Sequence, residues 1–263
     1  MIEKDPGSPR LTRQRIIHLF EADFNLFLNL QWGSRLVKRA AKPLDLIHAG
    51  QHGLVPRRKT MDPIMLTQLT SDLCRLMKHY LVRFDNDASA CYDRIIVALG
   101  MLAARRFGMP GNAMKTHADT LEFMRYAVTT IYGISKENYK GTPFEPLFGT
   151  GQGSGASPAV WLTLIILLME TLDRIIPERT TFSSPDSAIR HSRLIDAPFV
   201  DDTSLGFSDP GYLTLEILVA KLTNIAQTWE QLLYFSGGSL NLKNASGMYY
   251  TGTGRKDDHS CAR

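Results

Sequence analysis

The stretch Phe199-Val200-Asp201-Asp202 decides the fold, because it delivers two adjacent carboxylates at the end of an apolar run. Two neighbouring anions at the bend of a hairpin repel each other unless a cation joins them. A third carboxylate, Asp87, ends another apolar run far away in the chain. Carboxylates at the ends of separate strands are typical of sites that hold divalent cations, so the sequence predicts such a site.

A second motif lies between these acidic segments, and it reads Gln152-Gly153-Ser154-Gly155-Ala156-Ser157-Pro158. Pro158 falls in the first turn of the helix that we expect next, where a missing N–H is tolerated best. Gly153 would let the backbone approach a ligand closely. The alternative is a plain loop in front of a capped helix.

The other elements alternate between amphipathic helices and short strands. Apolar residues recur at helical spacing in residues 13–29, 30–41, 61–80, 94–107, 112–131, 158–176 and 212–233. Strands are expected at 81–87 and within 133–150. One hairpin is expected to pair 193–200 with 203–207, with Asp201 and Asp202 at its bend, and a second hairpin is expected within 239–251. This order predicts an α+β fold in which an antiparallel sheet is backed by helices.

Positive charge is concentrated at one end of the chain. Residues 1–60 hold 11 Lys or Arg and 5 Asp or Glu, although the net charge of the whole chain is only +4. A cationic end before an anionic centre suits a protein that binds a phosphate backbone with one part and metal ions with another. A solvated, lysine-rich helix face explains the charge equally well.

Cysteine usage and hydropathy indicate where the chain works. Three scattered cysteines, Cys74, Cys91 and Cys261, form neither a disulfide framework nor a metal-binding pair, which favours a reducing, intracellular location, nuclear or cytoplasmic. The longest apolar stretch, residues 159–169, is much shorter than the roughly 20 residues of a bilayer span. We therefore expect no membrane anchor and see no secretory signal.

The three motifs together resemble those of the reverse transcriptase family, in particular its non-LTR retrotransposon and group II intron branches. The family motif D-x-x-x-[AGC]-[FY]-D is similar to residues 87–93, Q-G-x-x-x-S-P to residues 152–158, and [FY]-x-D-D to residues 199–202. The resemblance covers about residues 10–250 and implies a right-hand polymerase palm with partial fingers. Residues 1–80 would form N-terminal helices and a fingers-like segment, residues 81–250 the palm, and residues 251–263 a disordered tail.

The resemblance implies an RNA-directed DNA polymerase that binds an RNA template, a DNA primer and dNTPs. Two Mg²⁺ ions, or Mn²⁺ in their place, would be held by the catalytic carboxylates Asp87, Asp201 and Asp202. The Ala88 carbonyl would assist them. The substrate-binding residues would be Tyr92, which excludes a 2′-hydroxyl by its bulk, and Gln152 with Gly153, which line the nucleotide site.

Two shorter segments are similar to further family motifs. Residues 51–60 resemble a fingers motif and imply that Arg57, Arg58 or Lys59 contacts the nucleotide triphosphate. The three cations are adjacent, so the motif can be aligned with any of them, and the choice among them stays open. Residues 238–243 resemble a later motif and imply that Lys243 protonates the pyrophosphate leaving group.

Several alternatives remain open at this level. Asp85 lies on the same strand face as Asp87, and the spacing to Tyr92 favours Asp87 as the metal ligand. An RNA-directed RNA polymerase would share the fold, although the bulk of Tyr92 argues against ribonucleotides. An inactive retroelement fragment that keeps only nucleic-acid binding is the third reading. Protein partners are not indicated.

If Tyr92 excludes the 2′-hydroxyl, Tyr92→Ala will raise ribonucleotide incorporation relative to deoxynucleotide incorporation by about tenfold or more. Primer extension with each nucleotide type measures the ratio. Tyr92→Phe keeps the bulk and should keep the preference. An unchanged ratio in the alanine variant would rule out the gate.

Overall fold

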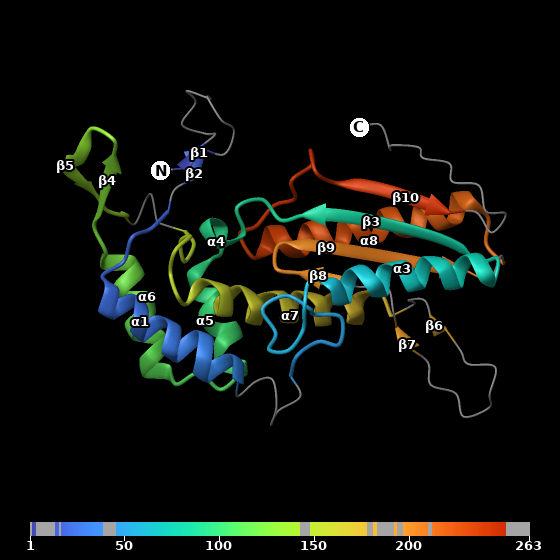
Figure 1. Cartoon of the computed structure of the whole chain (residues 1–263), viewed down its shortest axis with the longest axis horizontal. Coiled ribbons are helices and arrows are strands. Elements are labelled where there is room, and N and C mark those ends of the chain that lie inside the picture. The colour runs from blue at the N-terminus through green and yellow to red at the C-terminus, as the bar shows by residue number, and fades with distance from the viewer. Residues whose placement is uncertain are drawn as a thin grey trace. The chain divides into compact units, whose positions relative to one another are not determined.

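The computed structural model describes residues 2–3, 14–15, 17–38, 46–142, 148–177, 181–182, 192–193, 197–209 and 212–250. Two compact units are present, each assembled from two separate stretches of chain (Figure 1). The first combines Met1–Leu44 with Tyr92–Leu164, and the second combines Asp45–Cys91 with Ile165–Arg263. The boundaries expected at residues 80 and 250 stay a prediction, and residues 251–263 lie outside the described part.

The second unit is built on a four-stranded antiparallel sheet with the strand order β10-β3-β9-β8 (Figure 1). Its strands are β3 Tyr80–Asp87, β8 Ala197–Phe199, β9 Asp202–Asp209 and β10 Ser246–Tyr250. The central pair, β3 and β9, runs in unbroken register from Tyr80 opposite Asp209 to Asp87 opposite Asp202. The α+β class and the antiparallel sheet expected from the sequence are thereby confirmed.

Two long helices cover this sheet on opposite faces. α8, Leu215–Phe235, packs against β3 and β9, and α3, Met61–Leu76, packs against β3 and β8. Side chains alternate between the faces of a strand. Trp229 of α8 bonds to Asn86, whereas Cys74 of α3 contacts Ser208, which is the cross-strand partner of Leu81. Asn86 and Leu81 are an odd number of positions apart on β3, so their side chains point to opposite faces of the sheet. The two helices that contact these faces, α8 and α3, therefore lie on different sides.

A buried carboxamide joins the sheet to α8 beside the end of β3. Asn86 donates from Nδ2 to the Thr203 carbonyl at 3.0 Å, and its Oδ1 accepts from Trp229 Nε1 at 3.1 Å. Asn86 and Trp229 are both buried. A buried amide is tolerated when its polar atoms are hydrogen-bonded. This bridge therefore fixes β3 against β9 on one side and against α8 on the other.

The first unit is mainly helical. Its elements are α1 Ala22–Leu28, which continues as the π-helix η2 Asn29–Leu36, then α5 Val97–Arg106, α6 Gly111–Phe123, and the hairpin of β4 Tyr126–Thr130 with β5 Gly133–Tyr139. The Trp32 and His117 rings meet edge to face at 4.9 Å in its core. Gly100 allows close packing, because a Cβ there would lie 2.6 Å from Val160.

The remaining elements are short or run from one unit into the other. α4 Cys91–Arg94 and α7 Ser157–Ile175 continue across the division of the chain, and two small ladders pair β1 Ile2–Glu3 with β2 Gln14–Arg15 and β6 Thr181–Phe182 with β7 Ser192–Arg193. Among the helices in the described ranges, none combines the length and apolar character needed to cross a bilayer.

Three sequence expectations are wrong in detail. The helix expected at residues 13–29 begins at Ala22 and runs on without interruption into the π-helix Asn29–Leu36. The helix expected at 112–131 ends at Phe123, because the β-branched run that follows forms β4. The expected hairpin within 239–251 is instead a loop followed by β10, which pairs with the edge of β3.

Replacing Asn86 with alanine should lower the free energy of unfolding by about 1–3 kcal/mol, because it leaves the Trp229 N–H buried without its acceptor and removes the side-chain bond to the Thr203 carbonyl. Urea denaturation measures the change. Asn138→Ala, at an exposed asparagine of β5, serves as the control. Equal stability of the two variants would contradict the bridging role.

Candidate active site

The register of β3 and β9 places Asp87 directly opposite Asp202 at one end of the sheet of the second unit. Directly opposed residues of an antiparallel pair have Cα atoms about 4.5–5.5 Å apart. Asp201 lies in the adjoining turn, and its carbonyl accepts from the Ala88 N–H at 2.9 Å. The structure therefore brings together the three predicted carboxylates and Ala88.

The electrostatics of Asp202 report this convergence. Burial raises the pKa of the Asp202 carboxyl above its ordinary value, and the negative charges of Asp201 and Asp87 raise that pKa further. Each carboxylate therefore opposes ionisation of its neighbour. Among the described residues, no three His, Cys, Asp or Glu side chains are already gathered tightly enough to hold a metal ion. Repulsion between carboxylates that no cation neutralises explains why Asp87, Asp201 and Asp202 are not gathered more tightly.

The turn that presents Asp201 is conformationally strained. Val200 has φ = 61°, in the left-handed region that β-branched residues strongly avoid. A positive φ at the first loop position is characteristic of a type II′ hairpin turn, where glycine is usual. Surrounding contacts must therefore hold the residue in place.

One such contact comes from the segment Gln51-His52-Gly53. The His52 N–H donates to the Pro198 carbonyl at 3.0 Å, which joins the segment to β8. A Cβ on Gly53 would lie 3.0 Å from the Phe199 carbonyl carbon and would overlap the Val200 nitrogen. Glycine is thus required for close approach behind the turn. The sequence showed this glycine as part of a motif and gave no indication of its partner.

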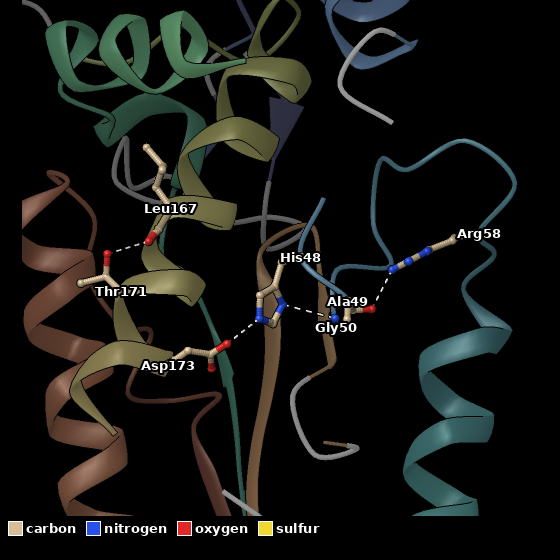
Figure 2. A network of polar contacts seen from close by, with 7 residues as sticks. All are labelled: His48, Ala49, Gly50, Arg58, Leu167, Thr171 and Asp173. Atoms are coloured by element: carbon tan, nitrogen blue, oxygen red, sulfur yellow. Dashed lines mark hydrogen bonds and ion pairs between the residues drawn. The ribbon is translucent and has the colours of Figure 1, made fainter. Parts of the chain in front are cut away.

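The loop that carries Gly53 is held by a polar network (Figure 2). His48 Nε2 lies 2.9 Å from Asp173 Oδ2 near the end of α7, and the Gly50 N–H donates to His48 Nδ1 at 3.2 Å. The Arg58 guanidinium donates to the Ala49 carbonyl at 2.9 Å, and also to the carbonyl of Gln51. These bonds close the loop on itself and fasten it to α7.

The three cations predicted to bind triphosphate differ in their surroundings. Arg58 is half-buried and engaged by the loop carbonyls, so it acts as a structural group in this state. Arg57 and Lys59 are exposed, and the Lys59 N–H donates to Asp62 Oδ2 at 2.6 Å. Contact of any of them with a nucleotide stays a prediction.

Asp87 is held by the loop between α8 and β10. Asn241 and Asn244 each donate from Nδ2 to Asp87 Oδ2 at 3.0 Å, and the Asn241 N–H donates to the Asp87 carbonyl at 2.9 Å. An isolated bridge pairs Ala88 with Leu240. Two amide N–H groups thus place positive partial charge beside Asp87 Oδ2, next to the aspartate pair. Sequence reasoning singled out neither asparagine as a partner of Asp87.

Lys243 lies between these two asparagines in the chain, and its side chain is exposed. The loop therefore brings the lysine into the neighbourhood of Asp87. Its assignment as the acid for the leaving group stays a prediction.

Asp85 has different partners from Asp87. Its Oδ2 lies 2.9 Å from Arg83 Nη2, and its Oδ1 accepts a hydrogen bond from the Ser204 hydroxyl. Asp85 is thus compensated within the sheet, two positions away from the acidic end. This difference favours Asp87 as the candidate ligand.

The first unit holds the other predicted site residues. Tyr92 and the Gln152-Gly153 loop lie together, since the Thr150 N–H donates to the Tyr92 carbonyl at 2.8 Å and the Gln152 N–H to Asp93 Oδ1 at 3.3 Å. Gly153 has φ = 104°, which an L-residue rarely adopts. Burial raises the pKa of Asp93, while the Gln152 N–H and His18 act in the opposite direction.

Folding favours the protonated form of Asp202, because the pKa of this carboxyl is raised in the folded chain. The contribution of Asp202 to the free energy of unfolding should therefore decline as pH rises from the ordinary pKa of aspartate, about 3.9, through the raised pKa. In buffer without divalent cations, Asp202→Asn should therefore gain stability relative to the parent chain between about pH 4 and pH 7. Urea denaturation across this range tests the trend. Asp23→Asn, at an exposed acid of α1, is the control. A stability difference that is constant with pH would contradict the repulsion.

No protein-family model and no curated protein matches this chain at a significant level. Solved structures are similar to it. Telomerase from Candida albicans, in complex with the TWJ fragment of telomeric RNA, matches 88% of this chain and 35% of its own length, with 14% identity and a TM-score of 0.57. Telomerase from Candida tropicalis, in complex with a TWJ fragment of telomeric RNA, matches 90% and 34%, with 12% identity and a TM-score of 0.54.

Apo telomerase from Candida tropicalis, truncated from its C-terminal domain, matches 91% of this chain and 42% of its own length, with 11% identity and a TM-score of 0.53. This chain thus spans between 34% and 42% of the length of these three proteins. Telomerase is a reverse transcriptase-related enzyme. At such low identity the likeness concerns the fold alone, and that fold is reverse-transcriptase-like.

Proposed function

We propose that this chain is the RNA-directed DNA polymerase domain of a retroelement, of the non-LTR or group II intron type, which adds deoxynucleotides to a primer 3′ end. The observation that carries the proposal is the placement of Asp87 opposite Asp202, with Asp201 in the adjoining turn. These acids come from two motifs far apart in the chain. In this proposal residues 81–250 form the palm, and residues 1–80 supply N-terminal helices and part of the fingers.

The donor set fits Mg²⁺, which prefers hard carboxylate oxygens and keeps several waters. The raised pKa of Asp202 supports the fit, since a cation would relieve the repulsion from Asp201 and Asp87 that contributes to that shift. Mg²⁺, or Mn²⁺ in its place, would neutralise the charge that develops on the attacking and leaving oxygens. Asp87, Asp201 and Asp202 would hold it.

The chain's own groups would share the remaining tasks. Asn241 and Asn244 hold the Asp87 side chain in place through hydrogen bonds to Oδ2. Lys243, exposed on the same loop, would donate a proton to the pyrophosphate leaving group. In the first unit, Gln152 and Gly153 would line the nucleotide site and Tyr92 would exclude the 2′-hydroxyl.

RNA template, DNA primer and dNTPs are the partners that this activity requires. The N-terminal excess of Lys and Arg supports binding of a phosphate backbone. Two of the similar telomerases are in complex with a fragment of telomeric RNA, which supports RNA binding as part of the proposal. Because the chain spans less than half of those proteins, activity of this chain by itself is part of the proposal.

The decisive experiment is Mg²⁺-dependent primer extension on a poly(rA) template with an oligo(dT) primer. Asp201→Asn should lower incorporation of dTTP by about a thousandfold or more, because charge stabilisation through a metal contributes several kcal/mol to the barrier. Its melting temperature should stay within a few degrees of the parent chain. Omitting the divalent cation should have the same effect as the substitution.

Asp119→Asn, on α6, is the matched control and should extend the primer normally. Full incorporation by Asp201→Asn would overturn the metal assignment. RNA binding without any synthesis by the parent chain would instead identify a nucleic-acid-binding remnant, and equal use of ribonucleotides would indicate an RNA polymerase.

A further inference from the structure

The N-terminal segment of the first unit closes on the loop that contains the Gln-Gly motif. The His18 N–H donates to the Gln152 carbonyl at 2.7 Å. Asn25 makes two bonds with one carboxamide: Nδ2 donates to the Gly153 carbonyl at 3.0 Å, and Oδ1 accepts from the Gly155 N–H at 2.6 Å. The N-terminal segment is therefore attached to the loop backbone at three residues, 152, 153 and 155.

The loop glycines are shaped for this segment. A Cβ on Gly151 would overlap the His18 ring, and a Cβ on Gly153 would overlap the His18 carbonyl oxygen. At Gly155, a Cβ would lie 2.9 Å from the Asn25 carbonyl oxygen. Each glycine in the loop thus permits contact with the N-terminal segment. For Gly153, the sequence alone had suggested close approach of the backbone to a ligand as its purpose.

The Asn25 carboxamide matches the loop in a way that other side chains do not. The loop presents a carbonyl acceptor at Gly153 and an N–H donor at Gly155, and an amide supplies one donor and one acceptor in a single rigid plane. Aspartate would keep the acceptor and lose the donor. Alanine would lose both.

The segment itself is anchored independently of the loop. The His18 ring packs against the Tyr126 ring at 5.1 Å and the Phe20 ring at 6.0 Å. Ser157 holds the other side of the loop, since its hydroxyl donates to the Thr150 carbonyl at 3.0 Å and the Gly151 carbonyl at 2.8 Å. The loop is therefore fixed from two sides. Ser157 binds it on one side, and Asn25 binds it on the other, more exposed side.

We infer that Asn25 is a positioning residue, which holds the Gly151–Gly155 loop in the shape that receives the incoming nucleotide. The assignment of a nucleotide to this loop rests on the proposed function. Asn25 acts through the loop backbone and does not itself contact substrate. The N-terminal segment is thereby a working part of the nucleotide site, although it carries none of the polymerase motifs.

The test combines hydrogen exchange with steady-state kinetics on the full chain. Asn25→Ala should speed amide exchange at residues 152–155 by about five- to tenfold, the effect of losing one or two modest hydrogen bonds. It should raise the KM for dTTP several-fold and change kcat less. Asn25→Asp keeps the acceptor for the Gly155 N–H, so its exchange at that position should stay closer to the parent chain. Asn112→Ala, at an exposed position of α6, should change neither readout.

Unchanged exchange in Asn25→Ala would overturn the clamp whatever the activity. Faster exchange with an unchanged KM for dTTP in an active enzyme would overturn the positioning role. A parent chain without any incorporation would remove the nucleotide assignment together with the proposed function, while the exchange result would still decide whether Asn25 holds the loop.

Discussion

The unbroken register between β3 and β9 is the constraint on which the site depends. A slip of one residue would move every side chain of β3 to the other face of the sheet. The Asn86 side chain would then leave the Trp229 N–H without its acceptor in the interior, and Asp87 would no longer stand opposite Asp202. The buried Asn86 amide and the neighbouring acidic cluster are therefore coupled. The hydrogen bonds of Asn86 fix the register of β3, and this register determines where Asp87 lies.

The acidic end of the sheet opposes folding and requires support from its surroundings. Asp202 is destabilised in its ionised form by Asp201 and Asp87, and Val200 is held at φ = 61°. The amides of Asn241 and Asn244 place positive partial charge beside Asp87 Oδ2. Functional sites commonly break local rules in this way, and neighbouring elements compensate. Both features are expected at the cation site that we propose, where function and not stability sets the arrangement.

Local patterns predicted what is locally determined. The helix at α3 and the strand at β3 follow from apolar periodicity, and the acids that end β3 and begin β9 were placed correctly. The course of residues 239–250 was missed, because β10 is selected by the free edge of β3 and no turn signal specifies that choice. Asn25 was invisible for a related reason: no sequence pattern joins it to Gly153, 128 positions away.

Glycines in the motifs allow close packing within the chain itself, in addition to any role in ligand binding. Gly53 gives room to the turn before Asp201, and Gly151 and Gly153 give room to His18. In each unit, a segment outside the recognisable catalytic motifs is packed against a motif so closely that a single Cβ would separate them. Such packing fixes loop shape without a ligand, which lowers the entropy that binding must overcome. The Gln-Gly motif is thus maintained by an N-terminal segment that carries no signature of its own.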